Sequence, residues 1–348
     1  MQYPEKIKTP AAWYGHEMAR NSHLWTYHLT SENIIELEKA AKSFEATKTP
    51  LGLISKTNFP LPNFVNFLTN MQNTLTNESG FQLIKGLPIK KYSPEIQSII
   101  FCGIGSYLGS ARSQNAAGHL LGHVRDIGAD VTNQKTRIYQ TNARQSFHTD
   151  SCDVVGLLCL KDAKKGGSSM LASSVTVYNE IAKTRPDLLT TLFEPVPYDR
   201  RGEFREDQQP FFTIPVYNWH QGFLTCIYHR TYIESAQNYK NAPKLTMKQR
   251  EVLDLLDEYL NDEKIHLKMH LEPGDMQFVY NHNLLHDREG YIDWPDLKDR
   301  RHLLRLWLSL PNDRPLPSVF KKRYGEITIG KRGGITTEQT ILQAPING

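Results

Sequence analysis

The segment RQSFHTDSCDVVGLLCLKD, residues 144–162, places a histidine and an aspartate two positions apart directly before an apolar run. Residues i and i+2 of a β-strand point to the same face, so we expect the side chains of His148 and Asp150 to project together. The run 154–160 is apolar enough for a strand that is buried on both faces. A lone histidine–x–aspartate pattern is a weak signal, because a histidine hydrogen-bonded to a neighbouring carboxylate has the same spacing.

Short strand-like segments dominate the chain from about residue 136 onward. They are bounded by turn residues, and the segment 264–275 alternates apolar and polar side chains with the two-residue period of a strand. The other segments of this kind are TRIYQTN (136–142), VVGLLCLKD (154–162), FFTIPVYNW (211–219), GFLTCIY (222–228), MQFVYN (276–281) and HLLRLWLSLP (302–311).

Four segments have helical patterns instead, and they cover residues 29–44, 62–75, 94–109 and 246–263. Three of them precede the strands and one interrupts them. This order predicts an α+β, mainly β fold, a jelly roll or β-sandwich with N-terminal and inserted helices. We expect one domain over residues 1–348, with a helical part at about 1–110, a jelly-roll core at about 136–312 and a tail at 313–348.

The composition is that of an ordinary globular protein, with 39% hydrophobic and 22% charged residues among 348. The net charge of +4 is spread along the chain, which does not favour binding to nucleic acid. We recognise neither a signal peptide nor a membrane-spanning run, and the four cysteines form no CxxC pair. We therefore expect a cytoplasmic protein with reduced thiols that binds neither nucleic acid nor membranes, and we leave a homo-oligomer open.

A third candidate ligand, His286, follows the strand-like segment 276–281. Two histidines and one carboxylate on one face of an octahedral ion leave three positions open, which is the arrangement in non-haem Fe(II) oxygenases. Imidazole and carboxylate ligands suit Fe(II), whereas a thiolate-rich site would favour zinc. The open positions can accept a bidentate 2-oxo acid and then O2.

A 2-oxo acid needs a partner for its far carboxylate, and arginine offers two parallel charge-assisted bonds. Arg301 and Arg305 share one face of their segment, whether it is a strand or a helix. The opposite face of a strand would be almost entirely leucine and should contact the core. Burial of both arginines would require an anionic partner, whereas a solvated basic edge is the alternative from spacing alone.

Four motifs, FHTD, KKGGSSMLASSVTVYNEI, NLLHDR and RRHLLRLWL, resemble in order and separation those of the Fe(II)/2-oxoglutarate-dependent dioxygenases related to taurine dioxygenase, the TauD/TfdA family. The resemblance covers roughly residues 75–312. It implies a double-stranded β-helix core of the clavaminate synthase-like type. It also implies that His148, Asp150 and His286 bind the iron and act in catalysis, and that Arg301 clamps 2-oxoglutarate.

Three further positions follow from this resemblance. Ser169 matches a hydroxyl, usually that of threonine, that hydrogen-bonds the 2-oxoglutarate carboxylate, although serine lacks the methyl group that restricts the rotamer. Arg305 matches a position that lines the active site and would contact substrate or 2-oxoglutarate. Asn142 lies in a region that often faces the substrate.

The resemblance also indicates the reaction, because halogenating relatives carry a small residue in place of Asp150. We therefore expect a dioxygenase that hydroxylates or otherwise oxidises an unactivated C–H bond of a small-molecule substrate, an anionic or zwitterionic metabolite. Succinate and CO2 would be released. The alternatives are a catalytically silent sensor on the same fold and a zinc hydrolase. The complete ligand set weighs against the sensor, and the two aligned arginines weigh against the hydrolase.

Overall fold

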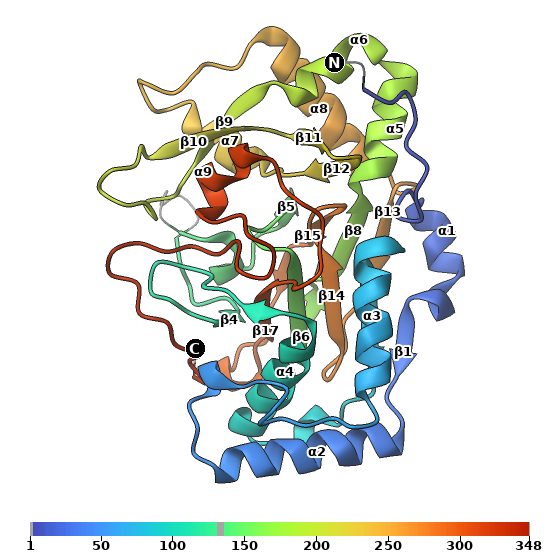
Figure 1. Cartoon of the computed structure of the whole chain (residues 1–348), viewed down its shortest axis with the longest axis vertical. Helices are drawn as coiled ribbons and strands as arrows, with labels where there is room; N and C mark the ends of the chain where they lie inside the picture. The colour runs from blue at the N-terminus through green and yellow to red at the C-terminus, as the bar shows by residue number, and fades with distance from the viewer. Residues whose placement is uncertain (1–2, 131–135, 348) are drawn as a thin grey trace.

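The structure is a computed structural model that describes residues 3–130 and 136–347 (Figure 1). Two β-sheets form its centre and contribute side chains to a shared apolar layer. The larger sheet has seven strands in the order β1-β2-β14-β6-β17-β3, with β4 also paired to β17. The smaller sheet has four strands in the order β13-β8-β15-β5.

Most strands belong to these two sheets. The larger sheet contains β1 (Thr26–His28), β2 (Phe81–Lys85), β3 (Ser110–Ala111), β4 (Leu121–Val124), β6 (Val154–Lys161), β14 (Met276–Tyr280) and β17 (His302–Ser309). The smaller sheet contains β5 (Gln145–His148), β8 (Ser169–Ser173), β13 (His266–Met269) and β15 (Leu284–Arg288). Three antiparallel pairs lie outside them: β9 (Pro195–Asp199) with β10 (Phe211–Pro215), β11 (Tyr217–His220) with β12 (Phe223–Cys226), and β7 (Lys165–Gly166) with β16 (Tyr291–Ile292).

Helices cover both sheets on their outer sides (Figure 1). The larger sheet packs with α2 (Ser31–Ala46), α3 (Val65–Asn77) and α4 (Pro94–Leu108), and the smaller sheet packs with α5 (Ser174–Thr184) and α8 (Met247–Asn261). Shorter helices are α1 (Gly15–Arg20), α6 (Pro186–Leu189), α7 (Arg230–Ala236) and α9 (Lys321–Tyr324). The 3₁₀ turns are η1 (Ser22–Leu24), η2 (Leu51–Leu53), η3 (Ile89–Lys91), η4 (Ile138–Gln140), η5 (Thr190–Phe193), η6 (Leu297–Asp299) and η7 (Ser318–Phe320).

Strand β17 separates the helical layer from the interior. Leu304, Leu306 and Leu308 pack into the core that the N-terminal helices share with the larger sheet. Leu303, on the opposite face, packs in the layer between the sheets. Arg305 shares that inner face and is buried, so the predicted division of this strand into a leucine face and an arginine face is confirmed.

Local capping explains where two of the helices begin. The Thr30 hydroxyl accepts a hydrogen bond from the Asn33 backbone N–H at 3.2 Å, and Asn33 Oδ1 accepts one from the Thr30 N–H at 3.0 Å. This capping box satisfies donors that the first turn of α2 would otherwise leave unpaired. At the start of α4 the Ser93 hydroxyl accepts a hydrogen bond from the Ile96 backbone N–H at 3.2 Å, and Pro94 occupies the first helical position.

Two local expectations are wrong. Residues 136–142 do not form a strand, because the Gln140 backbone N–H donates to the Arg137 carbonyl at 2.9 Å and closes the 3₁₀ turn η4. The segment 211–219 is two strands rather than one, since β10 ends at Pro215, which has no N–H for a continuous ladder.

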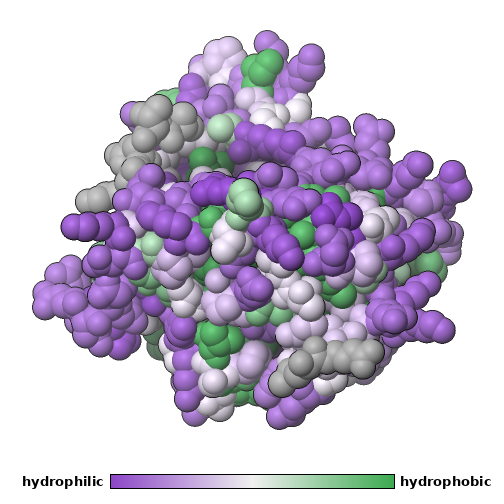
Figure 2. Space-filling model, turned by 90° about the horizontal axis from the view of Figure 1, so that it is seen from above, coloured by the Kyte–Doolittle hydropathy of each residue, from purple (hydrophilic) through white to green (hydrophobic). Residues whose placement is uncertain are grey.

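The surface of the protein is mainly polar on the face shown in Figure 2, where hydrophobic residues are scattered and do not gather into one patch. Within residues 3–130 and 136–347, no helix combines the length and the apolar character that a membrane span requires.

A buried ion network holds the C-terminal tail against the core. Arg332 is fully buried, and its Nε and Nη2 donate to Asp153 Oδ1 at 2.7 Å and to Asp313 Oδ2 at 2.6 Å. His282 Nε2 lies 2.9 Å from Asp153 Oδ1. Burial would raise the pKa of Asp153, but His282 and Arg332 outweigh it and hold that pKa below its usual value. The two carboxylates and the histidine have the spacing of metal ligands, yet a guanidinium already bridges them.

We predict that Arg332→Leu strongly destabilises the fold, because it leaves two buried carboxylates without their cation. Removing one partner of a buried ion pair costs about 3–5 kcal/mol. Chemical denaturation should show this loss in the free energy of unfolding. The control Lys331→Leu, at the exposed neighbouring position, should change it by less than about 0.5 kcal/mol. Equal stability of the two variants would show that the network is dispensable.

Candidate active site

The three predicted metal ligands meet at one edge of the smaller sheet. His148 ends β5, Asp150 lies in the turn that follows, and His286 is in the middle of β15. The two strands pair antiparallel with His286 directly opposite His148. Asp150 Oδ1 lies 3.9 Å from His148 Nε2, and Asp150 Oδ2 lies 3.7 Å from His286 Nε2. Strand register therefore brings together residues that are far apart in the sequence.

Hydrogen bonds orient the ligand atoms. The Ser146 carbonyl lies 2.8 Å from His148 Nδ1, which places the proton on that nitrogen and leaves Nε2 to face a metal. Trp307 Nε1 donates to Asp150 Oδ2 at 2.8 Å, and the Asp150 backbone N–H donates to Asn281 Oδ1 at 3.0 Å. The carboxylate and the backbone of Asp150 are thus each fixed by a hydrogen bond.

Burial and neighbouring charges set the protonation of the ligands. Burial, reinforced by the charge of His286, lowers the pKa of His148 to about 3, so its imidazole is neutral at pH 7. Burial alone would raise the pKa of Asp150, but Arg305 and the two histidines hold it well below its usual range. Arg305 Nη1 lies 3.5 Å from Asp150 Oδ2. A neutral imidazole and an ionised carboxylate are the states that metal binding requires.

The cluster fits a divalent ion. Ligand atoms of the three residues lie within 4.8 Å of one another. Two ligand atoms at right angles, each about 2.1 Å from an ion, are about 3 Å apart, so small rotations would close the observed gaps. Gln145 Nε2 lies 2.9 Å from His148 Nε2 and would turn aside when an ion binds.

A pocket beside the cluster ends at a buried arginine. Both sheets line it, and its wall includes His148, Ser169, His286, Arg301 and Arg305. Arg301 is buried, its Nη1 has no hydrogen-bond partner among the described residues, and its Nη2 lies 3.4 Å from the Gly167 carbonyl. A buried guanidinium with a free donor favours binding of an anion. The far carboxylate of a metal-bound dicarboxylate such as 2-oxoglutarate would supply it.

A Gly-Gly turn makes room for this arginine. Gly166 and Gly167 have φ angles of 80° and 77°, which residues with a Cβ atom rarely adopt. A Cβ atom on Gly167 would lie 3.1 Å from Arg301 Nε. The turn therefore lets the guanidinium and Ser169 line the same pocket.

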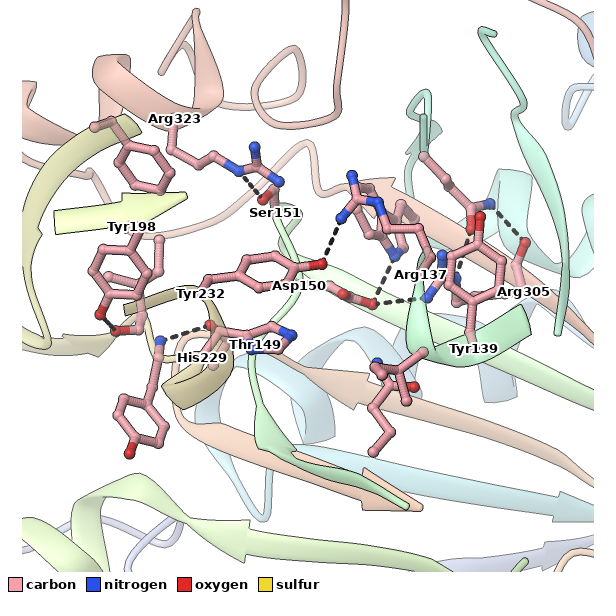
Figure 3. Close-up of a pocket in the computed structure, with 17 residues that line it drawn as sticks. Arg137, Tyr139, Thr149, Asp150, Ser151, Tyr198, His229, Tyr232, Arg305 and Arg323 are labelled. Atoms are coloured by element: carbon pink, nitrogen blue, oxygen red, sulfur yellow. Dashed lines mark hydrogen bonds and ion pairs between the residues drawn. The ribbon is translucent and has the colours of Figure 1, made fainter. Parts of the chain in front are cut away.

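A second pocket opens on the other side of Asp150 (Figure 3). Its wall carries Arg137, Arg305 and Arg323, and Asp150 is the only carboxylate that lines it among the described residues. Aromatic side chains complete the wall: Tyr139, Tyr198, Phe212, Tyr228, His229, Tyr232 and Trp307. Tyr139, Gln145 and Arg305 line both pockets, so the two meet beside the metal cluster.

The two predicted substrate residues fall in different places. Arg305 lines both pockets. Asn142 lines neither, because its backbone carbonyl accepts a hydrogen bond from the Tyr291 N–H at 3.1 Å and fixes this loop beside β16. Its exposed side chain lies in a surface hollow with Lys165 and Gly290. The geometry therefore does not support a substrate role for Asn142.

The cluster of two histidines and one carboxylate lies between two sheets, beside a buried arginine that has a free donor for an anion. This combination is that of a non-haem iron oxygenase that uses 2-oxoglutarate. A family model described as "Taurine catabolism dioxygenase TauD, TfdA family" matches residues 45–307, and the chain belongs to this family. The predicted family, double-stranded β-helix fold, dioxygenase activity, and use of Fe(II), 2-oxoglutarate and O2 are confirmed.

Individual relatives span nearly the whole chain. FR-33289 synthase of Streptomyces rubellomurinus (strain ATCC 31215) is 32% identical over 310 residues, which cover 86% of this chain and 90% of the relative. An asparagine oxygenase solved with Fe(II), 3-hydroxyasparagine and succinate superposes with a TM-score of 0.65 at 14% identity, over 82% of this chain and 93% of that chain. The non-haem iron oxygenase OrfP, solved with Fe and α-ketoglutaric acid, superposes with a TM-score of 0.61 at 15% identity. The superposition covers 81% of this chain and 93% of that chain.

Sequence reasoning missed most of the second pocket. Trp307 shares a strand face with Arg301 and Arg305, so the alternating pattern already contained the signal for it. Arg137 falls in a segment that was expected to be a strand, and Arg323 lies beyond the residues that the family model matches. No local pattern marks either as a pocket residue.

We predict that His148→Ala weakens Fe(II) binding by more than about 100-fold, since it removes a ligand and not merely a group that orients one. Anaerobic calorimetric titration with Fe(II) measures the change. His23→Ala, at an exposed histidine, should bind Fe(II) like the unaltered protein. Unchanged affinity in His148→Ala would show that the ion lies elsewhere.

We predict that Arg301→Gln weakens 2-oxoglutarate binding about 10- to 100-fold, because a hydrogen bond to a charged group contributes about 1.5–3 kcal/mol. Titration of the Fe(II)-loaded protein under anaerobic conditions tests this. Fe(II) affinity should stay unchanged. Arg300→Gln, which alters the preceding arginine outside this pocket, should leave both affinities intact.

Proposed function

We propose that this dioxygenase hydroxylates a C–H bond of a small anionic metabolite, with His148, Asp150 and His286 as ligands of Fe(II). Arg301 and Ser169 would bind 2-oxoglutarate. The observation that carries the proposal is the position of the three ligands beside a buried Arg301 whose Nη1 lacks a partner. One pocket therefore combines a metal site with a site for the far carboxylate of the co-substrate.

Bound Fe(II) would supply the redox chemistry that couples decarboxylation of 2-oxoglutarate by O2 to oxidation of the substrate C–H bond, with release of succinate and CO2. The side chains position the reactants. Trp307 and Arg305 hold the Asp150 carboxylate. Ser146 fixes the tautomer of His148, so that its Nε2 faces the site of the ion.

Arg305 stands between the co-substrate and the substrate. Its Nε donates to Gln114 Oε1 at 2.7 Å, and its guanidinium lies 4.6 Å from the centre of the Tyr139 ring. These contacts hold the cation at the boundary of the two pockets, where it would favour an anionic group on the substrate. A zwitterionic substrate with an anionic end would satisfy the same arginine.

Measurement of turnover distinguishes the oxygenase from the two alternatives, a catalytically silent sensor and a zinc hydrolase. We expect the unaltered protein to form succinate from 2-oxoglutarate with Fe(II) but not with Zn(II), and Asp150→Ala to lose this activity. Succinate can be measured by chromatography, with His23→Ala as the control. Binding of 2-oxoglutarate without succinate formation would indicate a sensor, and Zn(II)-dependent hydrolysis would contradict the oxygenase.

A further inference from the structure

Arg323 of α9 reaches the second pocket without a carboxylate partner. Its Nε donates to Ser151 Oγ at 2.6 Å, and no carboxylate of the described chain lies within the 4 Å of an ion pair. The guanidinium lies 5.6 Å from the centre of the Phe212 ring. Burial and the charge of Arg137 lower the pKa of Arg323 to about 10, which leaves it a cation at neutral pH. A partly buried cation of this kind favours an external anion.

The other two arginines of the pocket have acidic partners in the chain. Arg137 forms an ion pair with Glu203, and it also donates to the Tyr232 hydroxyl. Arg305 lies 3.5 Å from Asp150. Among the three arginines of this pocket, Arg323 is thus the one that has no acidic partner in the described chain.

Metal binding would change how the charges of these three arginines are compensated. An ion held by Asp150 and by the near carboxylate of 2-oxoglutarate has its two charges balanced by these two carboxylates, and the far carboxylate of 2-oxoglutarate would pair with Arg301. Arg305 then loses its counterion, and the pocket holds two uncompensated guanidinium groups, those of Arg305 and Arg323. A carboxylate or sulfonate carries one negative charge near pH 7, whereas a phosphate-type group carries close to two.

Two neutral groups that line the same pocket can add hydrogen-bond donors for an oxyanion. His229 is buried, lines the pocket, and has an Nδ1 without a hydrogen-bond partner among the described residues. Its ring stacks on that of Tyr232 with centres 3.6 Å apart, and the Tyr232 hydroxyl accepts from Arg137 and so has its own proton to donate. Figure 3 shows Arg323 entering from one side and Arg137 and Arg305 from the other, with the Tyr232 ring below Arg323 and its hydroxyl directed toward Arg137.

We propose that this pocket binds a tetrahedral dianion, a phosphate monoester or phosphonate group of the substrate, with Arg323 as the residue that selects it. The inference rests on the proposed function and narrows its substrate class. Arg323 would hold the dianion at the end away from the ion, so that the carbon to be oxidised lies toward His148, Asp150 and His286. The role is one of specificity, because Arg323 would contact the substrate without touching the reacting atoms.

The test uses the full chain loaded anaerobically with Fe(II) and 2-oxoglutarate, titrated at pH 8 with methyl phosphate, methylphosphonate, methanesulfonate and acetate. We expect at least one of the two dianions to bind about tenfold or more tightly than both monoanions. Arg323→Gln should remove about tenfold or more of that affinity, as expected for loss of a charge-assisted bond. Arg323→Lys should restore part of it. Comparison of the affinities for methyl phosphate and methylphosphonate shows whether the pocket prefers a phosphate monoester or a phosphonate.

Lys322→Gln is the matched control, because it removes a positive charge at the exposed neighbouring position. It should leave dianion affinity unchanged, and all variants should keep their 2-oxoglutarate affinity. Equal binding of monoanions and dianions, or equal losses in Arg323→Gln and Lys322→Gln, would overturn the inference while leaving the oxygenase intact. Failure of Fe(II) and 2-oxoglutarate to bind would instead contradict the proposed function.

Discussion

The pairing of β5 with β15 is the constraint on which the rest of the site depends. Its antiparallel register places His148 directly opposite His286. A shift of one residue would turn one imidazole to the other face of the sheet, because the side-chain period of a strand is two. Asp150 can approach both histidines because the chain leaves the sheet after β5. Strand pairing therefore positions the two histidines, and Trp307 orients the Asp150 carboxylate toward them.

Buried positive charge is the second organising feature. Strand β17 turns its leucines to the helical layer and carries Arg305 on the inner face, while Arg301 lies buried just before the strand. A buried cation is costly unless an anion or hydrogen-bond acceptors compensate it. Arg305 has Asp150, but Arg301 keeps an unpaired Nη1. On the proposed function, 2-oxoglutarate would supply the anion that Arg301 lacks, so that binding of the co-substrate would neutralise this buried charge.

The sequence was informative wherever a function or a fold depends on a short local pattern. A continuous apolar run located β6, and alternation of side chains located β17. Family motifs pointed to His148, Asp150, His286 and Arg301, which the structure brings to one place. The second pocket could not be predicted from local sequence patterns. Apart from Arg305 and Trp307 of β17, its residues come from elements scattered along the chain, among them η4, β9, β10, α7 and the C-terminal tail, and only tertiary packing brings them together. The same limitation explains Asn142, whose direction is set by a hydrogen bond to β16.

The C-terminal tail connects stability with specificity. Its contacts with the turn that carries Asp150 include three strong ones. Arg323 donates to the Ser151 hydroxyl, the Gly334 backbone N–H donates to the Ser151 carbonyl at 2.7 Å, and Arg332 bridges to Asp153. A segment that the family model does not match is therefore held by the same turn that presents the metal ligand. Because the ion network fixes where the tail lies, it also fixes where Arg323 enters the pocket. A change in the tail sequence could then alter which substrate is accepted while the metal cluster stays intact.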